Sequence, residues 1–181
     1  MILPTIRDSR FITIRCGGTL SDSHHYLLAL WAAQCAERVL PYFEKEHPDD
    51  DRPRKAIELA RSWARGEITV TEAKVGAYYS NAAARDVKGA AKFSALAAGQ
   101  SAAVAHVAAH ELGAAAYAIR AAMAASGDSE ARPNASISEA KREIGLRECA
   151  WQREQLPDEI RELVLDDQKN RNDICWNVFF L

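Results

Sequence analysis

Apolar side chains recur every three or four positions along most of the chain, which is the period of an amphipathic α-helix. The first such stretch predicts a helix from Ser21 or Asp22, both good N-cap residues, to about Phe43. Pro41 is expected to kink or end this helix. A second stretch predicts a helix over residues 53–65. Each of these helices has an apolar face that a neighbouring element must cover.

The next helical region becomes rich in alanine. Thr69 and Glu72 have the spacing of a capping box and predict the start of a helix that runs to about Val87. Residues 90–125 are dominated by alanine, the strongest helix former, and Gly99 is a candidate break between two helices there. Because alanine faces let helices approach closely, we expect this segment at the centre of the molecule.

The remaining elements are shorter. Residues 138–155 and 158–166 are predicted to form two further helices. The apolar residues 172–181 are expected to pack back on the core. Residues 1–20 contain one short alternating stretch with no second strand to pair with it, so they predict an irregular, extended arm. Residues 126–135 are predicted to be a flexible loop.

These elements predict an all-α fold. The sequence shows neither an alternation of strands with helices nor a fixed repeat period. We therefore expect a helical bundle of about six helices, with a central Ala-rich helix and an irregular N-terminal arm. A length of 181 residues fits a single domain over residues 1–181.

Composition narrows the function classes. Lys and Arg number 23 and Asp and Glu 25, a near balance that argues against a nucleic-acid partner. No continuously apolar stretch is long enough to predict a membrane-spanning helix, and residues 1–15 do not have the pattern of a secretory signal. The four cysteines form no C-x-x-C pair and fit a reducing compartment, so we expect a cytoplasmic protein.

The stretch HVAAHELG at residues 106–113 carries the strongest hint of chemistry. His106 and His110 are four residues apart, a spacing at which two imidazoles on one helix can bind the same metal ion. Glu111 follows the second histidine instead of lying between the two, so the zinc-protease motif is absent. A divalent metal would also need a third ligand from another helix. One alternative is a histidine pair at a helix seam, hydrogen-bonded to Tyr117, a carboxylate or the backbone, and another is a partner-binding surface.

A dense run of polar residues precedes the C-terminus. Acids at a helix C-terminus are disfavoured by the helix dipole, so Asp166 and Asp167 are expected to pair with cations. One interpretation is a structural clasp that holds the N-terminal arm through Arg7, Arg10 or Arg15. The other is a surface for a partner protein, with the candidate residues Asp166, Asp167, Arg171, Asp173 and Trp176.

The four tryptophans lie at helical apolar positions, so each is expected in the core. An exposed tryptophan would instead indicate a binding hot spot. The four are Trp31, Trp63, Trp151 and Trp176.

Taken together in order and spacing, several stretches resemble one known family. They are RFITIRCGGTL (10–20), LALWAAQCAE (28–37), DDRPRKAI (50–57), WARGEI (63–68), HVAAH (106–110), LP (156–157), IRELVLDDQ (160–168) and NDICW (172–176). The chain resembles the immunity proteins of bacterial polymorphic-toxin systems, the Imm-five-like group, over nearly its whole length.

This resemblance implies an all-α protein of the bacterial cytoplasm that binds and neutralises a cognate toxin, a role assigned to the group largely from neighbouring genes. It implies no catalytic residues and no cofactor. The main hypothesis is therefore a non-enzymatic binding protein whose partner is a toxin. The alternative is a metal-dependent hydrolase with His106 and His110 as ligands, and a third is a helical scaffold or homo-oligomer paired through its Ala-rich helices.

Overall fold

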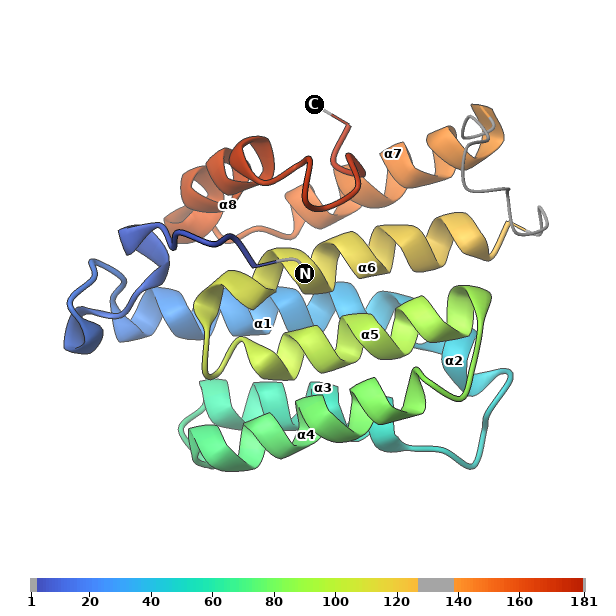
Figure 1. Ribbon diagram of the computed structural model, residues 1–181, viewed down its shortest axis with the longest axis horizontal. Coiled ribbons are helices and arrows are strands. Elements are labelled where there is room, and N and C mark those ends of the chain that lie inside the picture. Colours follow the sequence, from blue (N-terminus) through green and yellow to red (C-terminus); the bar gives the residue numbers. More distant parts are fainter. Residues whose placement is uncertain (1–2, 127–138, 181) are drawn as a thin grey trace.

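The computed structural model describes residues 3–126 and 139–180. Within these residues the chain is helical and forms no β-strand, which confirms the predicted all-α bundle (Figure 1). The α-helices are α1 (Asp22–Val39), α2 (Pro41–Glu44), α3 (Arg52–Ala64), α4 (Val70–Ala83), α5 (Gly89–Ala103), α6 (Glu111–Ala124), α7 (Glu139–Glu154) and α8 (Asp158–Asn170). Short 3-10 turns are η1 (Ser9–Phe11), η2 (Ile14–Cys16) and η3 (Ala108–His110).

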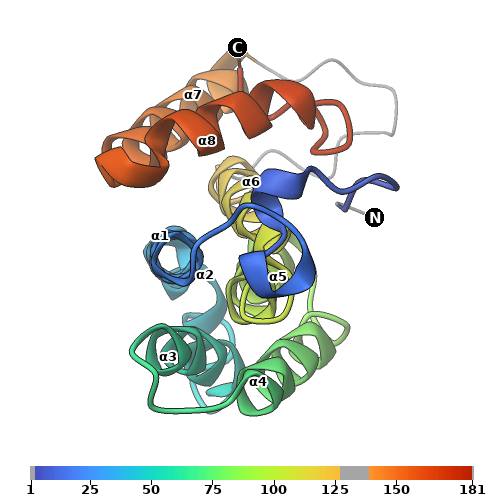
Figure 2. The ribbon, with the colours of Figure 1, turned by 90° about the vertical axis from the view of Figure 1, so that its left-hand side faces the viewer.

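The helices lie in layers, which Figure 2 shows end-on. Helices α3 and α4 form one outer layer, α1, α5 and α6 the middle layer, and α7 and α8 the opposite outer layer. Helix α5 packs against α1, α3, α4 and α6, and α6 also contacts α1 and α7. The two alanine-rich helices therefore lie at the centre, as the sequence predicts.

The alanine-rich region divides at a different place from the one that the sequence suggested. Helix α5 runs through Gly99 and ends at Ala103, and the chain reverses around Val107, whose φ and ψ of −144° and 107° are extended. The reversal lets the alanine faces of α5 and α6 pack against each other, so tertiary packing decides the break where local propensity alone favours a continuous helix.

Gly99 has a packing role within α5. A Cβ atom built on Gly99 would lie 2.6 Å from the Asn81 Oδ1 atom of α4. The glycine therefore permits close approach of two helices, which is the second common reason for a glycine inside a helical pattern.

Local capping signals are confirmed where they were predicted. The Ser21 hydroxyl accepts a hydrogen bond from the His24 amide at 3.2 Å and starts α1. At the start of α4, the Thr69 amide donates to the Glu72 carboxylate at 2.7 Å and the Glu72 amide donates to the Thr69 hydroxyl at 3.3 Å. Pro41 is the first residue of α2, and α1 ends at Val39 just before it, because proline has no N–H to continue the helical hydrogen bonds.

The two ends of the chain depart from the sequence prediction in detail. The arm over residues 3–20 is coiled into the two 3-10 turns η1 and η2 instead of being extended, and Thr13 forms a single bridge to Leu20. Cys175 and Phe179 are buried, which confirms that the C-terminal segment packs back on the core. All of the predicted loop 126–135 except Ser126 lies outside the described residues.

The tryptophans divide into two groups. Trp31 and Trp63 belong to the buried core, as predicted. Trp151 is half-buried under the Arg38 guanidinium, and Trp176 is 40% exposed. In the described part of the chain, no helix has the length and apolarity needed to cross a membrane.

Candidate partner-binding surface

His106 and His110 do not share a helix. His106 lies in the turn after α5, and His110 immediately precedes α6, so the assumption of one continuous helix through both residues was wrong. Their ring centroids are 5.1 Å apart, and the Nδ1 atom of His110 is 2.8 Å from the Gln100 Oε1 atom of α5. The two histidines therefore lie where α5 and α6 meet, and His110 is hydrogen-bonded to the side-chain amide of Gln100.

The surroundings of this histidine pair do not supply a metal site. Burial, followed by the charges of His106 and Arg171, lowers the pKa of His110 to about 4. Burial, followed by the charge of Lys74, lowers the pKa of His106. Nearby cations also disfavour a divalent ion. Residues 3–126 and 139–180 contain no group of three or more His, Cys, Asp or Glu side chains placed to hold one.

Behind the seam lies a buried ionic network that the sequence did not reveal. The Arg171 Nη2 atom is 3.2 Å from Glu111 Oε1, and its Nε donates to Asp167 Oδ1 at 2.7 Å. Arg171 also donates from Nη1 to the Ala109 carbonyl at 2.9 Å. All three charged side chains are buried. Asp167 and Arg171 were candidates for partner contact, and their burial makes them internal ties between α8 and the start of α6 instead.

The network contains two carboxylates and one guanidinium, so it would carry a net charge of one negative unit if both carboxylates were ionised. Burial raises the pKa of Glu111 well above its ordinary value, and the neighbouring Asp167 carboxylate raises it further. Glu111 therefore holds its proton at a pH where an exposed glutamate has lost it.

Glu111→Gln is expected to remove a pH dependence of stability. Because the folded pKa of Glu111 is raised, the folded protein binds this proton more tightly than the unfolded chain. The free energy of unfolding then falls as pH rises from the ordinary value of 4.5 through the higher folded pKa. Each unit of elevation corresponds to about 1.4 kcal/mol. Glutamine keeps the shape and cannot ionise, so the variant lacks this decline.

Urea unfolding of both proteins over a series from about pH 5 to pH 9 measures the effect. Glu143→Gln, at an exposed site on α7, is the matched control and should follow the wild-type curve. Parallel stability curves for the wild type and Glu111→Gln would contradict the assignment.

The C-terminal segment after α8 presents Trp176 at the surface. Trp176 and Asn177 have φ values of 59° and 55°, a left-handed conformation that non-glycine residues rarely adopt. The amide of Phe179 donates to Asn172 Oδ1 at 3.1 Å, and the side chain of Phe179 is buried. The anchored ends of the segment hold it in this conformation while the Trp176 indole is left 40% exposed.

Trp176 completes an aromatic–arginine cluster, which consists of Phe93, Tyr117, Arg120 and Trp176. The Arg120 guanidinium carbon lies 4.1 Å from the ring centroid of Phe93 and 4.1 Å from that of Trp176. The Tyr117 ring is 5.1 Å from Trp176 and 6.3 Å from Phe93. Such short distances indicate cation–π stacking that fixes the position of the guanidinium.

Sequence reasoning missed three members of this cluster. Tyr117 and Arg120 are three residues apart on α6, and Phe93 lies on the antiparallel neighbour α5. The sequence did offer one signal, because these three large side chains interrupt an alanine-rich region. Large residues there indicate helix faces that are not packed closely against a neighbouring helix. Trp176 is far from these residues in the sequence, so no local pattern predicts its contact with them.

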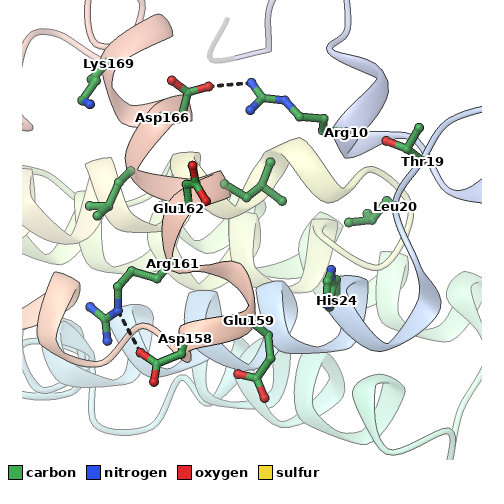
Figure 3. A pocket seen from close by; sticks show the side chains of 12 residues that line it. Arg10, Thr19, Leu20, His24, Asp158, Glu159, Arg161, Glu162, Asp166 and Lys169 are labelled. Carbon is green, nitrogen blue, oxygen red and sulfur yellow. Dashed lines mark hydrogen bonds and ion pairs between the residues drawn. The ribbon is translucent and has the colours of Figure 1, made fainter.

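A groove of about 820 Å³ separates the N-terminal arm from α8 (Figure 3). Asp166 points across it to Arg10, whose Nη2 atom lies 2.7 Å from Asp166 Oδ2. This ion pair confirms the predicted clasp for Arg10. Helix α8 continues to Asn170, beyond the predicted end at residue 166, because Arg10 and Arg171 neutralise Asp166 and Asp167 in its last turns.

Asp173 is exposed and remains a predicted partner contact.

The fold and the cluster define a class of protein, an all-α helical bundle with an exposed tryptophan packed on a half-buried tyrosine and arginine, which are residue types enriched at protein interfaces. Comparison with family models matches residues 18–159 to the family described as Imm-5 like putative immunity protein. Because this match covers most of the chain, the chain belongs to that family, as its sequence resemblance indicated. No curated protein and no solved structure matches the chain. The matched span includes Phe93, Tyr117 and Arg120 and ends before Trp176.

Proposed function

We propose that the protein neutralises a cognate toxin by binding it, without catalytic turnover and without a cofactor. Membership of an immunity-protein family supports this role, and the observation that carries it is the exposed Trp176 stacked on Arg120. In this proposal, the protein binds and covers the toxin in the cytoplasm. A protein that acts this way needs a rigid docking surface instead of a catalytic centre.

The aromatic–arginine cluster has the properties of such a surface. Trp, Tyr and Arg are the residue types most enriched among binding hot spots. Stacking between Phe93, Arg120 and Trp176 fixes these side chains before a partner arrives, which lowers the entropy cost of binding. The buried Arg171 network fixes the start of the segment that carries Trp176. We infer that Trp176 is the central contact.

Trp176→Ala is expected to abolish or strongly reduce protection of cells that express the cognate toxin. Loss of a hot-spot tryptophan costs about 2 kcal/mol or more, which is roughly a 30-fold loss of affinity. The measurement is survival on co-expression together with the dissociation constant of the purified pair. Tyr78→Ala is the matched control, because Tyr78 is an exposed aromatic residue on α4, in the opposite layer from Trp176.

Wild type and Tyr78→Ala should protect equally. The proposed function fails if the wild type forms no complex with the toxin. The assignment of the surface fails if Trp176→Ala binds as tightly as the wild type.

A further inference from the structure

Arg120 is a cation with no anionic partner among the described residues. No hydrogen bond or ion pair joins its guanidinium to any acceptor there, and its contacts are the rings of Phe93 and Trp176. The other half-buried or buried arginines at this end of the molecule differ. Arg153 donates to Gln168 and to the Phe179 carbonyl, and Arg171 binds two carboxylates.

The unpaired N–H groups of Arg120 reach solvent. In the described part of the chain, the buried polar side-chain atoms without a partner are Asn81 Oδ1, Gln152 Oε1 and Gln168 Nε2, and no nitrogen of Arg120 is among them. The rings of Phe93 and Trp176 lie against the guanidinium, and its N–H groups are left to water. Hydrogen-bond donors of a guanidinium lie in the plane of the group, so the exposed edge is the edge that binds.

The electrostatic surroundings favour an incoming anion. Burial lowers the pKa of Arg120, so the guanidinium has lost part of its hydration and an anion beside it would offset the cost of its charge. Toward the other end of the same pair of helices, the charges of Arg7 and Lys74 act on His106. Among the described residues, no carboxylate pairs with Arg120.

We propose that Arg120 is the binding site for an aspartate or glutamate carboxylate of the partner protein, held by paired hydrogen bonds from the exposed edge of the guanidinium. This inference rests on the proposed function. A guanidinium matches a carboxylate in geometry and charge, and the pair is strongest where both groups lose water. The Trp176 ring, which lies over the guanidinium, supplies the apolar cover.

A carboxylate fits better than a nucleic-acid phosphate. Binding along a nucleic-acid backbone uses many cations in a stripe, whereas the chain has a formal net charge of −2 and Arg120 stands alone between rings. One anchored guanidinium with aromatic neighbours is instead typical of a protein–protein contact.

The first test measures the affinity of the toxin complex for two Arg120 variants. Arg120→Lys keeps the charge but loses the planar fork, and should weaken binding by about tenfold. Arg120→Met keeps a long apolar side chain without charge, and should weaken binding by about 100-fold and reduce the dependence of affinity on salt. Arg65→Met, at an exposed arginine paired with Glu67 at the end of α3, is the control and should bind as the wild type does.

Equal affinity for Arg120→Met and the wild type would overturn the proposal. Normal binding by Arg120→Met together with a lower melting temperature would also overturn it, because Arg120 would then only support Trp176 structurally. Weakening that is the same for Lys and Met would also contradict a charge-paired role.

A second test uses the isolated protein and so separates this site from the toxin. The Nε–H resonance of Arg120 is followed by NMR during titration with acetate and, separately, with inorganic phosphate. A saturable shift with acetate, absent in spectra of Arg120→Met, supports the carboxylate site even if the toxin assignment fails. No saturable shift with acetate, or a response to phosphate alone, overturns it.

Discussion

Arg171→Met is expected to lower the free energy of unfolding by about 3–5 kcal/mol, because breaking a buried ion pair leaves uncompensated charge in the interior. Arg171 is the cation that binds Glu111 and Asp167, and all three side chains are buried. Methionine fills most of the volume but donates no hydrogen bond. Since native domains are stable by only about 5–15 kcal/mol, the variant should be close to unfolding at physiological temperature.

Urea unfolding of the variant and the wild type measures this loss. Arg65→Met serves as the control, because its partner Glu67 is on the surface and exposed ion pairs contribute little to stability. A loss for Arg171→Met no larger than that for Arg65→Met would show that the buried network does not stabilise the fold.

Trp31→Ala should cost about 3–5 kcal/mol, the usual range for removing a buried aromatic side chain. Trp31 is 1% exposed, and its indole Nε1 donates to the Gln152 carbonyl at 2.9 Å. Because Trp31 is on α1 and Gln152 on α7, the side chain joins the middle layer to an outer layer. The truncation therefore leaves a cavity and an unpaired carbonyl at the same contact.

Trp31→Phe separates the two effects. Phenylalanine fills most of the cavity but leaves the carbonyl unpaired, so we expect a smaller loss of about 1–3 kcal/mol. Tyr78→Ala, at a side chain that is 65% exposed, should change stability by less than about 0.5 kcal/mol. The melting temperature should be lowest for Trp31→Ala, higher for Trp31→Phe and highest for Tyr78→Ala. A Trp31→Ala protein as stable as Tyr78→Ala would contradict the assigned contact.

The parts of the fold that could be predicted from sequence are those that local interactions decide. Ser21 and Thr69 cap the helices that follow them, since a cap is formed within one turn of the chain. The break between α5 and α6 could not be placed, because alanine favours a helix throughout and the packing of the two helices decides where the chain reverses.

The candidate site was predictable only in part. Trp176 was identified from its dense polar surroundings, and Asp166 from its unfavourable place near a helix end. Contacts between distant residues had no signal in a single sequence. Glu111 and Arg171 are 60 positions apart, and the stacking of Arg120 on Trp176 depends on how the C-terminal segment returns over α6.

Hydrogen–deuterium exchange of the protein, free and mixed with the proposed cognate toxin, tests most directly whether the toxin covers Trp176. We predict slower exchange on binding in the segment 172–180 and in the part of α6 around Tyr117 and Arg120, with α3 and α4 unchanged. Slower exchange confined to α3 and α4, or no change over the segment 172–180, would contradict a docking surface centred on Trp176.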